Sequence, residues 1–144
     1  MTRGPERMTR AQFLARQRSV VRGGSPEDLA GQMESFGFAP EREHRAWCAG
    51  LTTKTGRPRR WAFDLAYPSL KVACEVDGGL FVSGGHSRGR ARMDDMEKDA
   101  EAMALGWRVL RVATDHVKDR TARRWLVRVL DAALASRGGE HERH

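Results

Sequence analysis

The stretch WAFDLAYPSLKVACEVDGG, residues 61–79, predicts two β-strands joined by a tight turn. Residues 61–67 are rich in aromatic and apolar side chains, and residues 72–76 form a second, mostly apolar run. Pro68 and Ser69, which lie between the two runs, are typical turn residues. The chain is therefore expected to fold back on itself here as an antiparallel hairpin.

Three carboxylates lie on this hairpin: Asp64, Glu75 and Asp77. Because side chains alternate along a strand, Glu75 and Asp77 share one face, and the apolar side chains of the second strand take the other. A loop over residues 68–71 pairs Tyr67 with the first residue of the second strand. This register places Asp64 opposite Glu75.

The opposition of two acids is the feature that points to a metal. Directly opposed residues have Cβ atoms about 5 Å apart. Two carboxylates at this distance repel each other, and a divalent cation between them removes the repulsion. Carboxylate oxygens are ligands that suit Mg²⁺ or Mn²⁺.

These residues resemble the active site of the PD-(D/E)XK nuclease superfamily, in which one strand carries Asp and the next carries a D/E-x-K tripeptide around Mg²⁺. Asp64 matches the first acid and Glu75 the second. Asp77 stands at the lysine position, where some branches also carry an acid. The resemblance extends through residues 84–89 and 93–111. This wider pattern is similar to small phage endonucleases, including junction-resolving enzymes, and to the very-short-patch branch and its relatives.

The resemblance implies an α/β, restriction-endonuclease-like fold with an αβββαβ core, a central mixed sheet flanked by helices, and extra N-terminal and C-terminal helices. Periodicity and punctuation predict strands at residues 41–49, 61–67, 72–76 and 107–114, and helices at residues 10–21, 26–36, 91–105 and 119–136. Residues 1–24 are expected to form a basic arm, residues 25–137 a single nuclease domain, and residues 138–144 a disordered tail.

The helix expected at residues 91–105 has two different sides. Asp95, Lys98 and Asp99 lie together on one side. Lys98 is the expected substitute for the family lysine, because a helix beside the strands can bring an ammonium group to the carboxylates. The alternative is a surface ion pair with Asp94 or Asp95. The apolar stripe of this helix consists of Met93, Met96, Ala100, Met103 and Ala104.

The resemblance also implies roles for the groups around the metal. Asp64, Glu75 and the backbone carbonyl of Val76 would bind Mg²⁺, for which Mn²⁺ could substitute. Asp77 would hold a second ion or accept a proton from water. His86, in the glycine-rich segment that follows, is a candidate general acid, water-positioning group or phosphate donor. The alternative for His86 is a solvated loop histidine.

Two further acids are candidates for supplementary ligands. Glu34 lies on the helix before the first strand, where the superfamily often contributes an acid; the alternative is a solvated helix glutamate. Glu43 precedes the hairpin at a point where similar phage enzymes carry an acid. The alternative for Glu43 is a salt bridge on an edge strand.

The composition favours a polyanionic partner. The formal net charge is +7 and the sequence pI is about 10.4. No apolar run approaches the roughly 20 residues of a membrane span. Cys48 and Cys74 form no disulfide or metal framework, which fits a reducing cytoplasmic compartment in a bacterium or an infected cell. The expected DNA contacts are Arg18, Arg22, Arg57, Arg59, Arg60, Arg88 and Arg90.

Together these features predict a compact Mg²⁺-dependent DNA endonuclease. Within that class we expect a homodimer that cleaves branched DNA, namely four-way (Holliday) junctions. One alternative is a nicking endonuclease of the very-short-patch or restriction type that recognises a mismatch or a short sequence. Another, from a different class, is a non-catalytic DNA-binding protein on a nuclease fold.

Overall fold

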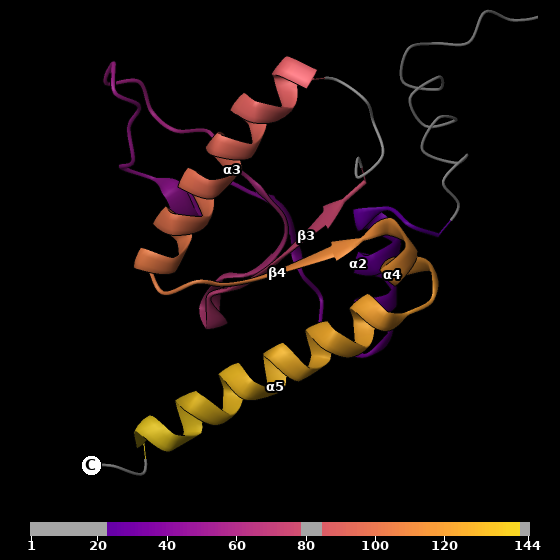
Figure 1. The fold of residues 1–144 in the computed structure, drawn as a ribbon. Coiled ribbons are helices and arrows are strands. Elements are labelled where there is room, and N and C mark those ends of the chain that lie inside the picture. The colour runs from indigo at the N-terminus through magenta and orange to yellow at the C-terminus, as the bar shows by residue number, and fades with distance from the viewer. Residues whose placement is uncertain (1–22, 79–84, 142–144) are drawn as a thin grey trace, which may run out of the picture.

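The computed structural model describes residues 23–78 and 85–141, which form an α/β fold around one mixed sheet (Figure 1). The strands are β1 (Glu41–His44), β2 (Phe63–Tyr67), β3 (Val72–Asp77) and β4 (Arg108–Ala113). The helices are α2 (Pro26–Ser35), α3 (Gly85–Ala104), α4 (Thr114–Lys118) and α5 (Thr121–His141), with 3₁₀ turns η1 (Ala46–Cys48) and η2 (Pro68–Leu70).

The sheet has the strand order β1-β2-β3-β4. Strands β1, β2 and β3 are antiparallel neighbours, whereas β3 and β4 are parallel and are connected through α3. Helix α3 covers one face of the sheet, and α2 and α5 cover the other (Figure 1). The expected α/β class and the helix and strand order of an αβββαβ-type core are therefore confirmed.

The hairpin has the expected register. Tyr67 pairs with Val72, and Lys71 takes a left-handed conformation with φ of 51° that closes the turn. Strand β2 begins at Phe63, two residues later than expected, because Trp61 packs among other aromatic rings instead of pairing in the sheet. The local turn chemistry thus sets which residues of β2 and β3 face each other.

Helix α2 begins and ends where its sequence indicates. The Ser25 side chain accepts a hydrogen bond from the backbone of Asp28, and the Asp28 carboxylate accepts one from the backbone of Ser25. This reciprocal cap fixes the start of the helix. Gly37, with φ of 84°, follows its last turn.

Strand β1 ends five residues earlier than expected. Instead of a strand over residues 41–49, the chain turns at Ala46–Cys48 into a 3₁₀ turn. The turn buries Trp47, whose ring stacks on Phe63 with centroids 4.4 Å apart. Burial of a large aromatic side chain stabilises the fold more than further edge-strand pairing of these residues would, so packing overrides the weak alternation.

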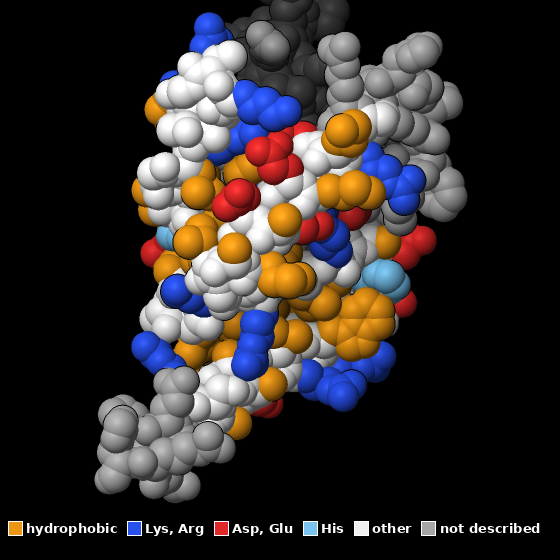
Figure 2. Space-filling view, turned by 60° about the vertical axis from the view of Figure 1, so that its left-hand side comes forward, with side chains coloured by type: hydrophobic (Ala, Val, Ile, Leu, Met, Phe, Trp, Pro, Cys, Tyr) orange, Lys and Arg blue, Asp and Glu red, His pale blue; other side chains and the backbone are white. Residues whose placement is uncertain are grey.

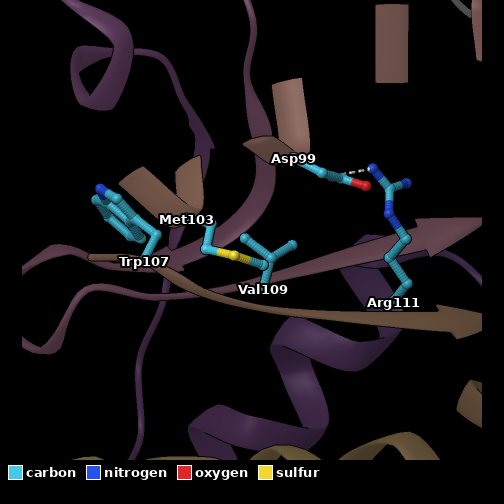
Figure 3. Close-up of a pocket in the computed structure, with 5 residues that line it drawn as sticks. All are labelled: Asp99, Met103, Trp107, Val109 and Arg111. Carbon is cyan, nitrogen blue, oxygen red and sulfur yellow. Dashed lines mark hydrogen bonds and ion pairs between the residues drawn. The ribbon is translucent and has the colours of Figure 1, made fainter. Parts of the chain in front are cut away.

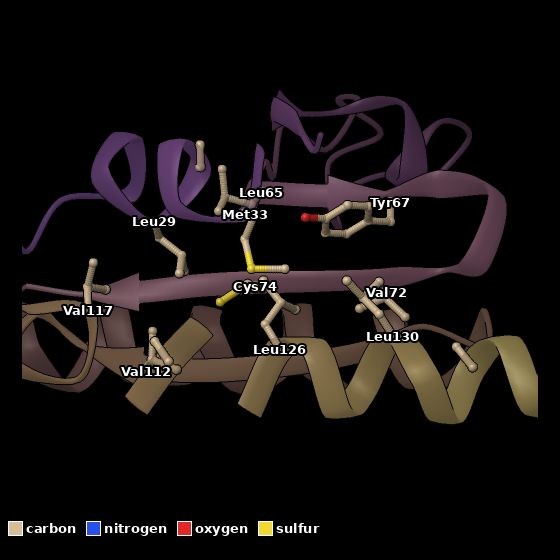
Figure 4. Packing of buried hydrophobic residues seen from close by; sticks show 13 residues of the cluster. Leu29, Met33, Leu65, Tyr67, Val72, Cys74, Val112, Val117, Leu126 and Leu130 are labelled. Atoms are coloured by element: carbon tan, nitrogen blue, oxygen red, sulfur yellow. The ribbon is translucent and has the colours of Figure 1, made fainter. Parts of the chain in front are cut away.

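The face of the sheet under α2 and α5 holds the aliphatic core. Side chains from both helices and from three strands point toward one another between the layers (Figure 4). The largest completely buried members are Leu29, Met33, Leu65, Val72, Val117, Leu126 and Leu130. As expected, Cys74 lies on this apolar side, and burial raises the pKa of its thiol to about 12.

The face under α3 is built differently. Its buried residues are Trp47, Cys48, Phe63, Ala66, Ala73, Ala102 and Trp107. Among the described residues of α3, the buried ones are Lys98, which is 7% exposed, and Ala102. Aromatic rings and small residues leave room at the end of the strands for charged side chains.

The apolar stripe of α3 does not face the core. Met93, Met96 and Met103 are 72%, 59% and 77% exposed. The expectation that α3 packs through a methionine stripe is wrong, because Lys98 and Ala102 occupy the inner side of the helix. Polar contacts with Glu75 and Ala62 stabilise the buried Lys98 ammonium, and the hydrophobic periodicity of the sequence does not predict such contacts.

The remaining elements differ from expectation at their ends. Strand β4 is at the end of the sheet order, although its mostly apolar sequence is typical of a central strand. Helix α5 continues to His141, into the segment expected to be a disordered tail. Helix α3 begins at Gly85, so the backbone of His86 is helical. Within the described residues no helix is both long and apolar enough to cross a membrane.

Candidate metal centre and active site

Four charged residues line up across the four strands of the sheet. The pairing of β1 with β2 sets Glu43 opposite Asp64, and the hairpin register, continued by one residue, sets Asp64 opposite Glu75. Glu75 in turn pairs with Arg111 on β4. The row therefore reads acid, acid, acid, arginine, with its two middle members on the central strands.

Asp64 is half-buried, and among the described residues it has one hydrogen-bond donor. Its Oδ2 atom accepts a hydrogen bond of 2.8 Å from the backbone N–H of Val76. Burial raises the pKa of Asp64, and the negative charges of Glu43 and Asp77 raise it further, while the Val76 N–H and Lys98 oppose the shift. Asp64 is thus a carboxylate whose negative charge is poorly compensated by the protein.

Glu75 is compensated by Lys98. The Lys98 ammonium donates to Glu75 Oε1 and, at 2.8 Å, to the carbonyl oxygen of Ala62. It also lies 5.3 Å from the centre of the Phe63 ring. Burial raises the pKa of Glu75, and the contact with Lys98 counteracts that rise. The structure therefore brings Lys98 to the carboxylate pair from α3, and not into the alternative surface pair.

Asp77 is directed away from Asp64 and toward β4. Arg111 Nη1 lies 3.4 Å from Asp77 Oδ1 and 3.9 Å from Glu75 Oε2. The same guanidinium donates a 2.6 Å bond to Asp99 on α3. Arg111 was not among the expected site residues. Its signal in the sequence was an arginine that, with Arg108, interrupts an otherwise apolar strand.

The two supplementary acids have different surroundings. Glu43 borders a cavity of about 320 Å³ that Asp64 also lines, together with residues of α2 and β1. Its backbone has φ of 50°, a left-handed conformation that costs a non-glycine residue about 1–3 kcal/mol and recurs at functional sites. Glu34 instead forms an exposed ion pair of 2.8 Å with Arg42 and does not line this cavity.

The basic side chains of the turn over residues 52–60 differ in their contacts with the rest of the protein. Arg59 is bonded to Glu97 and lies 4.5 Å from the centre of the Trp61 ring, so it ties the turn to α3. Arg57 and Arg60 are exposed. The side chains of His86, Arg88 and Arg90 lie outside the described part of the chain, as do Arg18 and Arg22.

The residues in the middle of the charged row provide part of a binding site for a divalent metal ion. Among the described residues, no three Asp, Glu, His or Cys side chains gather closely enough to form a complete site. Asp64 and Glu75 supply two carboxylates. The Val76 N–H points to Asp64, and in an antiparallel pair the N–H and C=O of a residue point to the same neighbour, so the Val76 carbonyl lies on that side. Mg²⁺ is commonly held by one or two carboxylates and several waters.

No family model, no curated protein and no solved structure matches this chain. The interpretation of the site therefore depends on its geometry and on the pattern of residues in the sequence.

Proposed function

We propose that this protein is a metal-dependent DNA endonuclease that hydrolyses phosphodiester bonds. The observation that carries the proposal is the opposition of Asp64 and Glu75 on β2 and β3, with the buried Lys98 ammonium on Glu75. This trio has the composition of a PD-(D/E)XK site, with the lysine supplied by a helix instead of the second strand. A purely structural ion pair would not require Asp64.

The proposed metal ligands are Asp64, Glu75 and the Val76 carbonyl. Mg²⁺ bound there would supply Lewis-acid activation of the phosphodiester and of the attacking water. The raised pKa of both carboxylates supports the assignment, because a cation would relieve the desolvation and mutual repulsion that burial imposes. Asp77, which is held by Arg111, is then a less direct participant than the sequence predicted.

Lys98 and Arg111 have separate tasks in this proposal. Lys98 fixes the orientation of Glu75 and places an ammonium group beside the reacting centre, where it can orient water or assist a proton transfer. Arg111 lies against Asp77 and Asp99 and keeps these acids from repelling a phosphate. Both cations are anchored by two or more contacts, as a preorganised site requires.

DNA is the proposed substrate because the chain carries a net charge of +7 and exposes Arg57 and Arg60 near the site face. Four-way junctions are the proposed structure within that class. A domain of this size has little surface for reading a sequence, whereas a junction can be recognised by phosphate contacts and by the spacing of two active sites. Two sites require two copies of the chain.

The decisive experiment compares cleavage of four-way, flap, mismatched and linear DNA by the wild-type protein and by Asp64→Asn. Asp64→Asn should abolish cleavage and retain DNA binding, because it removes a metal ligand but keeps the shape of the side chain. Asp131→Asn, an exposed acid on α5, is the matched control and should cleave normally. EDTA should stop the reaction.

Three outcomes would contradict the proposal at different levels. Wild-type rates in Asp64→Asn would exclude the proposed active site. Equal cleavage of linear and four-way DNA would exclude junction selectivity and leave a general endonuclease. DNA binding with no cleavage of any substrate in Mg²⁺ or Mn²⁺ would favour a non-catalytic DNA-binding protein.

A further inference from the structure

We propose that the outward side of α5 binds the phosphate backbone of a second DNA segment, separate from the segment at the metal centre. The surface is the α5 arginine cluster, which consists of Arg120, Arg123, Arg124 and Arg128. The proposal rests on the proposed function in one respect, namely that DNA is the partner. It concerns binding alone, so it holds or fails independently of cleavage.

The first argument is that the positive charge of the cluster is not neutralised within the described part of the chain. Residues 120–130 contain four arginines and no acid. Among the described residues, no Asp or Glu forms an ion pair with any of the four. The arginines near the site differ in this respect. Arg59 is bonded to Glu97, and Arg111 donates to Asp99 (Figure 3).

Two acids border the cluster and limit its length. Asp119 precedes it, and hydrogen bonds from Thr121, together with the charge of Arg124, lower the pKa of the Asp119 carboxyl. Asp131 follows Arg128 by three positions. The cluster between them extends over about 12 Å of the helix axis. One strand of duplex DNA presents a phosphate about every 3.4 Å along its axis, so this length corresponds to about three phosphates.

The second argument is that these charges do not serve the stability of α5. Arg123 and Arg124 lie in the first turn of the helix, which contains no acid, and the helix dipole disfavours cations there. Arg124 and Arg128 are four positions apart, so two like charges are neighbours on the helix surface. A polyanion that binds across the cluster relieves both kinds of repulsion.

The third argument is the backbone of Arg120. Its φ of 67° is a left-handed conformation that follows the end of α4, a position where glycine is preferred. Its N–H donates to the Val117 carbonyl, and its own carbonyl accepts from the N–H of Arg124. Neither bond requires an arginine side chain. That side chain is exposed, so core packing does not explain it either.

Arg123 is held in position by α2. Its guanidinium carbon lies 4.6 Å from the centre of the Phe36 ring, and Phe36 is 54% exposed. A cation on an aromatic face keeps its charge while its movement is restricted. An arginine that is already ordered loses less conformational entropy when it binds a phosphate.

The surroundings of the cluster favour DNA over an anionic membrane. A helix that lies on a membrane buries an apolar side in the lipid. The apolar side of α5 is in the core instead, where Leu126 and Leu130 are completely buried. A contact with phosphates that does not depend on sequence needs only the cations that α5 provides. The face shown in Figure 2 is less uniform, because acidic and hydrophobic side chains lie among the basic ones.

The position of the cluster implies a second DNA segment. Glu75 and Lys98 lie on the side of the sheet that α3 covers, whereas α5 covers the other side (Figure 1). The sheet and the body of α5 therefore stand between the metal centre and the outward side of α5. A straight duplex at the metal centre does not reach the cluster, whereas a second arm of a branched DNA can.

The test measures binding of four-way and linear DNA in EDTA at several salt concentrations. For four-way DNA, the triple variant Arg120→Gln, Arg124→Gln, Arg128→Gln should lose at least about 30-fold in affinity at about 0.1 M salt. The slope of log affinity against log salt should fall by about 2–3, because each phosphate contact contributes about 0.9. Linear DNA should lose much less, because it does not engage both surfaces at once.

Single substitutions separate the cluster from total charge and from folding. Arg124→Gln should weaken four-way DNA binding by about 5–10-fold, and Arg124→Lys should retain most of the affinity. Arg137→Gln is the matched control, because Arg137 is exposed on the same helix beyond Asp131, and it should bind nearly normally. Arg120→Gly should weaken binding while the melting temperature stays the same or rises, since glycine suits a φ of 67°.

Four results would overturn the proposal. One is an unchanged affinity and salt slope in the triple variant. Another is equal weakening by Arg124→Gln and Arg137→Gln, which would show that only the total charge matters. The third is an equal loss for linear and four-way DNA, which would exclude a second segment. The fourth is normal DNA binding by a triple variant that no longer binds phosphatidylglycerol vesicles, which would identify a membrane surface.

These results are distinct from a failure of the proposed function. Normal cleavage by Asp64→Asn would exclude the active site and leave the binding measurements in EDTA unaffected. A triple variant that binds four-way DNA normally would exclude the second surface and leave the proposed active site in place.

Discussion

The two faces of the sheet are covered by helices in opposite ways. Under α2 and α5 the contacts are aliphatic, and many side chains are completely buried. Under α3 the contacts are aromatic rings, alanines and a lysine, and the outer side of the helix carries the methionines. One face of the sheet supplies most of the hydrophobic stabilisation, and the other holds the charged residues.

The proposed active site therefore lies on the face of the sheet where hydrophobic packing is less complete. Buried charges are costly unless they are paired, and each of Glu75, Lys98 and Arg111 has a partner. Among the described residues, Asp64 has only a backbone N–H and the more distant charge of Lys98 to compensate its carboxylate. If the comparison is right, substitutions on the α3 face should change activity, and substitutions on the α5 face should change stability.

After the loss of cleavage expected for Asp64→Asn, the largest effect should come from Lys98→Ala. We expect the single-turnover cleavage rate to fall by roughly 10²–10⁴-fold, the range typical of a group that assists proton transfer. DNA affinity should change little. Lys54→Ala, in the exposed turn, is the control and should cleave at the normal rate. A loss of affinity at an unchanged rate would assign Lys98 to phosphate binding.

Leu126→Ala should have the reverse effect. Leu126 is completely buried on α5, and its truncation should lower the free energy of unfolding by about 2–5 kcal/mol. Leu134→Ala on the same helix, at a half-exposed position, should cost much less. Denaturant unfolding gives both values. Cleavage per folded molecule should remain normal in both variants. A slower rate in the folded variants would contradict the assignment of stability to one face of the sheet and activity to the other.

Glu43→Gln and Glu34→Gln should separate the two supplementary acids. Glu43 shares a cavity with Asp64, so its loss should raise the Mg²⁺ concentration needed for half-maximal cleavage by about 10-fold, the lower end of the range for groups around a metal. Glu34 is paired with Arg42 and should have no effect on the metal requirement. Equal effects would remove Glu43 from the site.

The smallest effect should be on the melting temperature. The pKa of Asp64 is raised in the folded state, so the folded protein favours the protonated carboxyl. The stability that this protonated form contributes is lost as the pH rises through the folded pKa and the carboxyl ionises. Asp64→Asn removes this loss and should raise the melting temperature by about 2–5 °C at pH 8. Below the unfolded pKa of about 3.9 the two proteins should melt alike.

Glu75→Gln should behave differently from Asp64→Asn in the same melting experiment. It leaves the Lys98 ammonium buried without a charged partner, so it should lower the melting temperature at pH 8. If both variants are stabilised, then Lys98 contributes less to the charged row than its contacts indicate.

The sequence was most informative where local rules decide the structure. The turn residues and strand alternation correctly predicted the register that opposes Asp64 and Glu75. The capping residues of α2 were also predicted correctly, because a helix cap depends on residues next to it in the sequence. The rotation of α3 could not be predicted in this way, because hydrophobic periodicity favours burial of Met96 and Met103. A lysine that is buried by its ion pair reverses that preference.

Two other features depended on contacts between distant segments. The end of β1 follows from the stacking of Trp47 on Phe63, which no local pattern indicates. Arg111 meets Asp99 and Asp77 only after the parallel pairing of β3 with β4. Its place in the site follows from the topology, because the sequence of the strand, which also contains Arg108, does not distinguish it.

The hairpin also has a consequence for the order of folding. Asp64 and Val76 are 12 positions apart and meet when the β2–β3 turn closes, an event of about 1–10 µs. Lys98 reaches Glu75 only when α3 has crossed over and β4 has paired, which is slower because parallel strands need a long connection. The two carboxylates therefore meet before their ammonium arrives. Folding should accelerate wherever that early repulsion is screened, by Mg²⁺, by salt or by Asp64→Asn.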